Sequence, residues 1–289
     1  MLSEKQKGEL SLYGQVLLSG LFPVITVLTV SAISPLYAAA IGTALSALFF
    51  AAVLTVRRRW ALPKSRAVWT DILFAAFFIG IVFYTLIFIG YKHTSAGNGA
   101  VMSLMEVFFT FLIVNLLVKH ERFVAIHAIG GLLMVSGALF ILIPEWSGAV
   151  HSGDLLIVLA TISAPIGNIF AKRARKQVSA EMLMFIRSII GAFFLFLLAA
   201  SFESAPALST LLSLWFPLLF SGFLYLGLSK LLWVEAIHRL PIAKTISLSA
   251  TNIPLALLFA WMFLGQSPTG EQIAAMLPMI GGMFLLLKK

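Results

Sequence analysis

The sequence is dominated by apolar runs of about 20 residues, which alternate with short connections that are polar or carry Pro and Gly. Because a helix rises about 1.5 Å per residue, such a run crosses the roughly 30 Å hydrocarbon core of a bilayer. A soluble chain carries about 25% charged residues, whereas this 289-residue chain carries 11%, with 61% hydrophobic residues. The sequence therefore predicts an all-α integral membrane protein with ten transmembrane helices, at residues 10–30, 34–56, 69–90, 97–118, 123–143, 154–174, 181–201, 212–235, 242–264 and 269–287.

The basic residues indicate how these helices are oriented. Cytoplasmic loops of membrane proteins are enriched in Lys and Arg. If both termini are cytoplasmic, the opposite loops hold only Lys92. The net charge of +9 then reflects lipid-facing and cytoplasmic loops, and nucleic acid is not expected as a partner because no basic stripe with interleaved aromatics is present. We expect a multi-pass inner-membrane protein whose cytoplasmic segments carry Lys5, Lys7, Arg57, Arg58, Arg59, Lys64, Arg66, Lys119, Arg122, Lys172, Arg173, Arg175, Lys176, Arg239, Lys288 and Lys289.

The chain also aligns with itself at an offset of 145 residues. Identities at this offset include His93 with His238, Met134 with Met279 and Gly137 with Gly282, and the predicted helix boundaries match. The halves, 1–146 and 147–289, each hold five predicted helices. An odd number gives the halves opposite orientations in the membrane, and such inverted repeats are typical of transporters.

At this point the chain resembles the drug/metabolite transporter superfamily, in particular its EamA-type members. The resemblance rests on the five-plus-five plan and on a segment that recurs in each half, a hydrophobic helix end followed by a Gly-containing helix. In the first half this segment is 116–123 with Gly130, Gly131 and Gly137; in the second it is 261–266 with Gly281 and Gly282. Glu121 fits the acidic position of the family pattern, Gln266 replaces it in the second half, and Pro254 and Arg187 fit its proline and arginine, while Phe109 and Gly42 stand at their repeat mates.

The resemblance implies a pathway between the halves, lined by the first, third and fourth helices of each repeat. It also implies cargo such as amino acids, other metabolites, drugs or sugar conjugates, which are most often exported. We expect no catalytic residue, metal or cofactor, because the chain has no Cys, its His residues lack ligand spacing and no nucleotide-binding motif is present.

Glu106 is the most informative ionisable residue within the predicted spans. It lies about ten residues, or about 15 Å, into its helix and therefore near the bilayer midplane. A charge at this depth costs about 2.5–3.5 kcal/mol on insertion scales, so a functional reason is expected. Glu106 could bind a cation or an ammonium group or carry a proton; alternatively, it is a protonated carboxyl bonded to a neighbouring helix. Its repeat mate is Thr251.

Further candidates share this depth or line the expected pathway. Pro23 and Pro165 predict a break near mid-membrane in the first helix of each repeat, which would point to a binding site. Arg187 could extend toward the cytoplasmic surface or hold a substrate carboxylate. Lys230 and Lys244 are interpreted as anchors that extend to that surface, with the alternative that they line the inner mouth of the pathway. The candidate substrate-binding residues are Glu106, Asn252, Thr251, Asn168, Ser249, Met102, Tyr84, Tyr225 and Arg187.

These observations favour a secondary transporter that exports a small metabolite such as an amino acid. An importer of an organic cation such as a quaternary amine and a non-transporting scaffold remain alternatives. A membrane enzyme acting on lipid is disfavoured, because no acidic or His cluster is found at an interface. A homodimer and proton coupling are left open.

Overall fold

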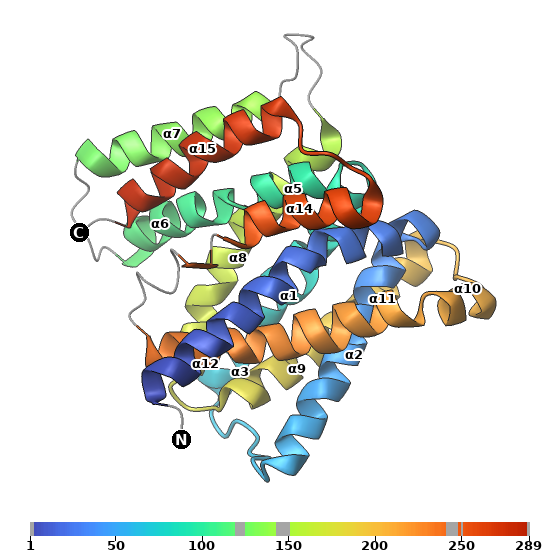
Figure 1. Cartoon of the computed structure of the whole chain (residues 1–289). Coiled ribbons are helices and arrows are strands. Elements are labelled where there is room, and N and C mark those ends of the chain that lie inside the picture. Colours follow the sequence, from blue (N-terminus) through green and yellow to red (C-terminus); the bar gives the residue numbers. More distant parts are fainter. Residues whose placement is uncertain (1–2, 119–124, 143–150, 241–247, 250, 288–289) are drawn as a thin grey trace.

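The computed structural model describes residues 3–118, 125–142, 151–240, 248–249 and 251–287, and within these ranges every regular element is helical (Figure 1). The first half contains α1 (Glu4–Ala32), α2 (Pro35–Val56), α3 (Arg66–Ala75), η1 (Ala76–Phe83), α4 (Tyr84–Lys92), α5 (Ala96–Met102), α6 (Met105–Val118) and α7 (Ala125–Leu142). The second contains α8 (Ser152–Ala174), α9 (Ala180–Phe202), α10 (Leu208–Ser213), α11 (Trp215–Leu219), η3 (Phe220–Ser229), α12 (Lys230–Arg239), α14 (Asn252–Leu264) and α15 (Gly270–Leu286).

Eight helical stretches of the described residues are long and apolar enough to cross a membrane. Two shorter apolar helices, α14 and α15, lie where the ninth and tenth spans are predicted. The chain is thus an all-helical, multi-pass membrane protein, while the count of ten and the cytoplasmic termini stay predictions. The boundary at 146 and the residues Glu121, Arg122 and Lys244 lie outside the described residues.

A capping side chain places the start of α1 earlier than hydropathy does. α1 begins at Glu4 rather than residue 10 because Ser3 and Gln6 form a reciprocal capping box, which satisfies two free N–H groups. Thr269 and Gln272 do the same for α15, and Gly265 ends α14 with a φ of 67°. Hydropathy cannot detect these boundaries, since caps are polar residues outside the apolar run.

Helix packing follows the 145-residue repeat. α2 packs on α9 and α7 on α15, so each of these pairs joins equivalent helices of the two halves (Figure 1). α1 packs on α14, α12 and η3, and its counterpart α8 packs on α6, α3, α4 and η1. The contacts of α1 with α14, α12 and η3 therefore have counterparts in those of α8 with α6, α4 and η1.

The glycines of the recurring segment allow α7 and α15 to approach closely. A Cβ atom at Gly282 would meet the carbonyl oxygen of Gly130 and lie 2.8 Å from Cγ of Met134. A Cβ at Gly137 would lie 2.6 Å from the carbonyl oxygen of Ala275. Small residues let helix backbones approach closely in membranes, so these glycines join α7 to α15.

The predicted breaks at Pro23 and Pro165 are wrong, because α1 and α8 run through both prolines as continuous helices. A membrane helix tolerates the missing N–H of proline when packing and neighbouring side chains support that turn. The irregular segments lie elsewhere. η1 and η3, in the third helix of each half, are π-helical and equivalent at the 145-residue offset, and the fourth helix of the first half is interrupted between α5 and α6.

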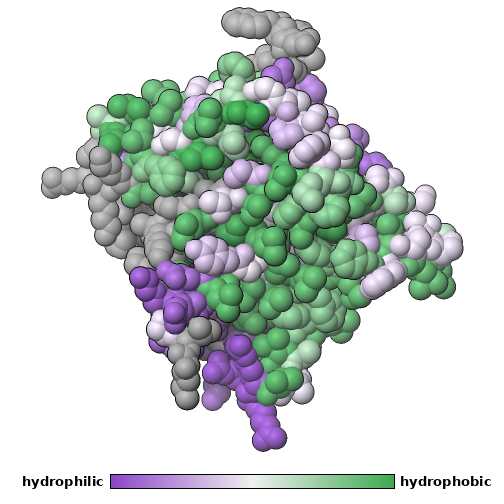
Figure 2. All heavy atoms as spheres, viewed as in Figure 1, coloured by the Kyte–Doolittle hydropathy of each residue, from purple (hydrophilic) through white to green (hydrophobic). Residues whose placement is uncertain are grey.

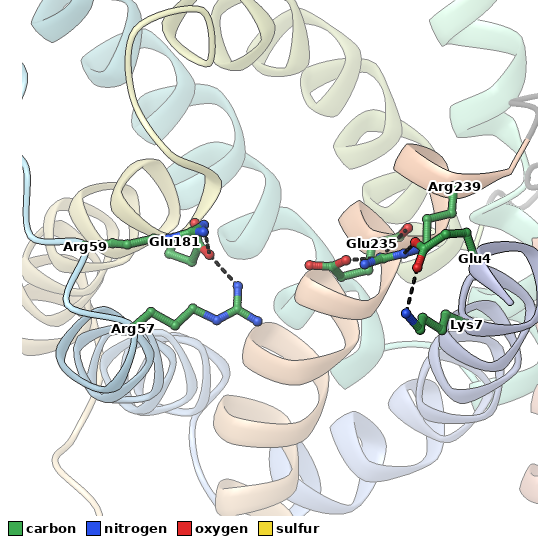
Figure 3. Close-up of polar contacts among 7 residues, drawn as sticks. All are labelled: Glu4, Lys7, Arg57, Arg59, Glu181, Glu235 and Arg239. Carbon is green, nitrogen blue, oxygen red and sulfur yellow. Dashed lines mark hydrogen bonds and ion pairs between the residues drawn. The ribbon is translucent and has the colours of Figure 1, made fainter. Parts of the chain in front are cut away.

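The surface view shows a hydrophobic band with hydrophilic residues gathered at the end that carries the N-terminus (Figure 2). We call this the basic end; it carries Lys7, Arg57, Arg59, Arg173 and Arg239, and the other end is the opposite end. Arg57 and Arg59 pair with Glu181 at 2.6 and 3.7 Å (Figure 3). Arg239 donates hydrogen bonds to Glu235 and to Glu4, and these bonds, the first more than the second, raise the pKa of the Arg239 guanidinium. Arg239 therefore stays cationic.

Candidate functional site

The interruption of the fourth helix places a polar side chain inside the membrane. Between α5 and α6 the amides of Leu104, Glu106 and Val107 bond to carbonyls three residues back, at 3.0–3.2 Å. This tightening separates two half-helices and leaves Glu106 in the first turn of α6. In the second half α14 begins at Asn252, after Thr251, the repeat mate of Glu106. Short helices at equivalent positions of two halves mark binding sites in many transporters.

Glu106 lies within electrostatic range of a basic residue from the other half. The Glu106 carboxyl and the Lys230 ammonium interact electrostatically, although they form no ion pair within 4 Å in the described structure. Lys230 Nζ lies 4.7 Å from the centroid of the Tyr225 ring, a cation–π distance. The ammonium therefore points back along its helix, away from the basic end. The interpretation of Lys230 as an anchor extending to that surface is wrong, because a ring and a carboxyl inside the protein attract its charge.

Aromatic side chains form one wall beside these charges. Phe22 of α1 stacks on Tyr225, with ring centroids 3.7 Å apart and planes at 15°. Phe22 also meets Phe88 and Tyr91 of α4 edge-on, with centroids 6.1 Å apart in each pair. Phe22, Phe88 and Tyr91 are buried, whereas Tyr225 is partly exposed. Tyr225 thus presents one edge of a rigid aromatic stack next to Lys230.

Hydroxyl and amide groups connect α1 to Ser229, the residue before Lys230. Gln15 Nε2 donates to Ser19 Oγ at 2.8 Å, and Ser19 Oγ lies 3.4 Å from Ser229 Oγ. The buried Gln15 Oε1 accepts no hydrogen bond. A buried acceptor without a partner is costly. We define Glu106, Lys230, Tyr225 and Phe22 as the central site.

The structure brings only some of the predicted residues together. Glu106 and Tyr225 belong to the central site, and Asn252 lies beside α1, where a Cβ at Gly20 would be 3.3 Å from its carbonyl oxygen. Met102 and Tyr84 are buried in the core, Ser249 is partly buried, and Asn168 and Thr251 are exposed. Their roles as ligands stay predictions.

Arg187 lies apart from the central site, where α9 crosses η1. It is buried, with 6% of its surface exposed, and its backbone and Cγ are close to Gly80. Among the described residues it has no hydrogen bond or ion pair. The two roles predicted for Arg187, extension to the surface and binding of a substrate carboxylate, both stay predictions.

Sequence reasoning did not place Lys230 in the central site, although it left open that Lys230 lines the inner mouth of the pathway. A signal for Lys230 was available: it lies on the third helix of the second half, which the family resemblance places along the pathway, and its mate, Thr85, is also polar. Within the described ranges, no three His, Asp or Glu residues are grouped so that they could hold a metal ion.

Comparison with known proteins identifies what kind of molecule carries this site. The model of the EamA-like transporter family matches residues 6–143 and again residues 151–288. The chain belongs to the EamA-like transporter family. These two matches cover nearly the whole chain, so this EamA-like protein is a membrane transporter.

Individual relatives agree with this assignment. The chain is 29% identical over 241 residues to the uncharacterized protein PA1977 of Pseudomonas aeruginosa, covering 83% of this chain and 80% of that one. It is 25% identical over 212 residues to the uncharacterized transporter YoaV of Bacillus subtilis, covering 72% and 70%. A solved crystal structure superposes with a TM-score of 0.70 at 17% identity, covering 98% of both chains, which shows a shared fold.

Proposed function

We propose that this EamA-like transporter exports a small zwitterionic metabolite, such as an amino acid, across the inner membrane. The observation that carries the proposal is the placement of Glu106 and Lys230, opposite charges from the two halves, beside Tyr225 at the interruption of the fourth helix.

The two charges match the two ends of an amino acid. The Glu106 carboxylate would accept hydrogen bonds from the substrate ammonium, and Lys230 would bind the substrate carboxylate. Charge-assisted bonds of this kind are roughly twice as strong as neutral ones. Without substrate the residues partly neutralise each other, which lowers the cost of keeping each charge within the membrane. The aromatic stack of Tyr225 and Phe22 would contact the apolar part of the substrate.

The mirrored packing supports alternating access between two inverted repeats. α1 and α8 hold equivalent positions and contact equivalent helices. Two such halves in opposite orientations can exchange conformations, so that a site between them opens first to one side and then to the other. A scaffold has no need of this arrangement.

Lys230 also favours an amino acid over an organic cation, the substrate of the alternative importer. Its ammonium would repel a quaternary amine from Glu106, whereas an amino acid satisfies both charges.

The experiment compares an amino acid with the amine that lacks only its carboxylate. Purified protein is tested by thermal shift and by uptake and export in proteoliposomes. We expect the amino acid to bind at least about tenfold more tightly than the amine, since a hydrogen bond to a charged group contributes about 1.5–3 kcal/mol. Lys230→Gln should remove most of this difference. Tighter binding of the amine by the unmodified protein would instead support the cation importer.

A further inference from the structure

A second polar cluster lies at the opposite end, outside the central site. Asp154, in the first turn of α8, has 0% of its surface exposed. Thr94 Oγ1 donates to its Oδ1, and Asn98 Nδ2 donates to its Oδ2 at 3.2 Å. Within the described residues, both hydrogen bonds to this carboxylate come from neutral donors, and His151, the N-cap residue of α8, interacts with it electrostatically.

Further bonds extend this cluster across both halves. Gln272 Nε2 of α15 donates to Asn98 Oδ1 at 2.8 Å, and the backbone N–H of Ala96 donates to Gln266 Oε1 at 3.1 Å. The start of α5, in the first half, is therefore bonded to α8, to α15 and to the segment after α14, all in the second half.

Close backbone contact seals the same end. A Cβ at Gly153 would lie 2.5 Å from the carbonyl carbon of His93 and 2.7 Å from the carbonyl oxygen of Gly90. A Cβ at Gly90 would lie 2.7 Å from Cγ1 of Ile157. α4 and α8 thus touch through glycines, which leaves no space for a solute between them.

The basic end has a comparable close contact, in which Gly8 and Arg239 stand at the repeat mates of Gly153 and Thr94. Gly8 lies 145 residues before Gly153, and a Cβ there would lie 2.9 Å from Cγ of Leu240 and 3.0 Å from Cβ of Arg239. Arg239 Nε donates to Glu4 at 2.9 Å (Figure 3). α1 and α12 are therefore joined at one end as α8 and α4 are at the other, but the bond of Glu4 is an exposed ion pair and that of Asp154 is buried.

We propose that Asp154, Asn98 and Gln272 are gating residues that close the opposite end of the transport pathway and must separate for solute to pass. The gate residues come from both halves, so movement of one half against the other breaks their bonds. The inference rests on the proposed transport function. Bonds made only in the closed conformation bias the equilibrium toward it, and removing them favours the conformation that is open at this end.

The chain has no cysteine, so a single introduced thiol reports accessibility. Ser103→Cys, in the interruption between the gate and Glu106, is the reporter, and a membrane-impermeant maleimide is applied from the side of the opposite end. Ala205→Cys, in the exposed α9–α10 connection, identifies that side. In the reporter background, Asp154→Asn replaces the carboxylate oxygen that accepts from Asn98 with an amide that donates, so this hydrogen bond is lost. Labelling of the reporter should then accelerate about tenfold, which corresponds to a shift of about 1.4 kcal/mol in the equilibrium between the closed and open conformations.

The exchanged pair provides a sharper test. Combining Asp154→Asn with Asn98→Asp restores every bond, because Thr94, Gln272 and the exchanged amide each again face an acceptor. Labelling should return to near the parent rate, whereas Arg239→Gln, which weakens the basic-end contact, should not accelerate it. A rate that is unchanged by Asp154→Asn in a folded protein, or not restored by the exchange, overturns the gate.

The labelling assay needs no substrate, so it separates the two proposals. If labelling responds as expected but no amino acid moves in the flux assay, the gate stands and the substrate assignment fails. If amino acids move while labelling is insensitive to all three variants, the gate fails alone.

Discussion

Replacing Glu106 with Gln is expected to lower amino-acid export from proteoliposomes by roughly tenfold or more. The amide keeps the shape of the side chain but loses the charge that would bind the substrate ammonium. A hydrogen bond to a charged group contributes about 1.5–3 kcal/mol, and about 1.4 kcal/mol is a factor of ten. Initial rates over a range of internal substrate concentrations give the change.

Glu271→Gln is the matched control. Glu271 is an exposed carboxylate in the first turn of α15, so its neutralisation removes the same charge without touching the central site, and export should stay at the parent rate. Equal export by the Glu106→Gln variant and the parent, at every pH tested, would remove Glu106 from the mechanism.

Replacing Gly282 with Ala should destabilise the transporter, while the same change at the neighbouring Gly281 should not. The new methyl group at Gly282 would meet the backbone oxygen of Gly130, which cannot turn away, so α7 and α15 must separate. Overpacking of this kind costs about 1–3 kcal/mol. A Cβ at Gly281 meets no atom within 4 Å.

Thermal unfolding of the two purified variants, followed by loss of the monodisperse detergent-solubilised peak, measures this difference. The Gly282→Ala variant should unfold several degrees below the parent, and Gly281→Ala should coincide with it. Equal stability of the two variants would mean that the close α7–α15 contact is not what the recurring glycines provide.

The positions of the helices were largely predictable because the hydropathy that indicates them is averaged over about 20 residues. Runs such as residues 181–201 and 154–174 differ from α9 and α8 by at most two residues at either end, since hydropathy over 20 residues outweighs any single position. Their ends were less predictable. The start of α1 depends on one side-chain pair, Ser3 and Gln6, and polar caps have no hydropathy signal.

Irregular backbone was placed in the wrong helices by sequence reasoning. Proline suggested breaks at positions 23 and 165, but packing holds both turns. The interruption at Ser103 and Leu104 contains no proline and forms through hydrogen bonds to carbonyls three residues back. Such tightening depends on tertiary contacts that a single sequence does not display.

Of the two charged residues in the central site, Glu106 was predictable from the sequence and the position of Lys230 was not. The depth of Glu106 in its predicted span was enough to select it, because a carboxyl near the midplane needs a reason. Lys230 was assigned to the surface, since long basic side chains usually reach it. Its direction follows from Tyr225, five residues earlier in the same helix, and from Glu106, and the position of Glu106 is known only once the halves are packed together.

Export of a labelled amino-acid mixture from proteoliposomes tests the central claim most directly. Vesicles containing the parent protein, the Glu106→Gln/Lys230→Gln double variant or no protein are loaded with the mixture, and the contents are measured by mass spectrometry over time. We predict that at least one zwitterionic amino acid leaves the parent vesicles faster than the protein-free ones and that the double variant loses this flux. Retention of every amino acid by the parent vesicles, or equal loss from parent and double variant, would contradict the account.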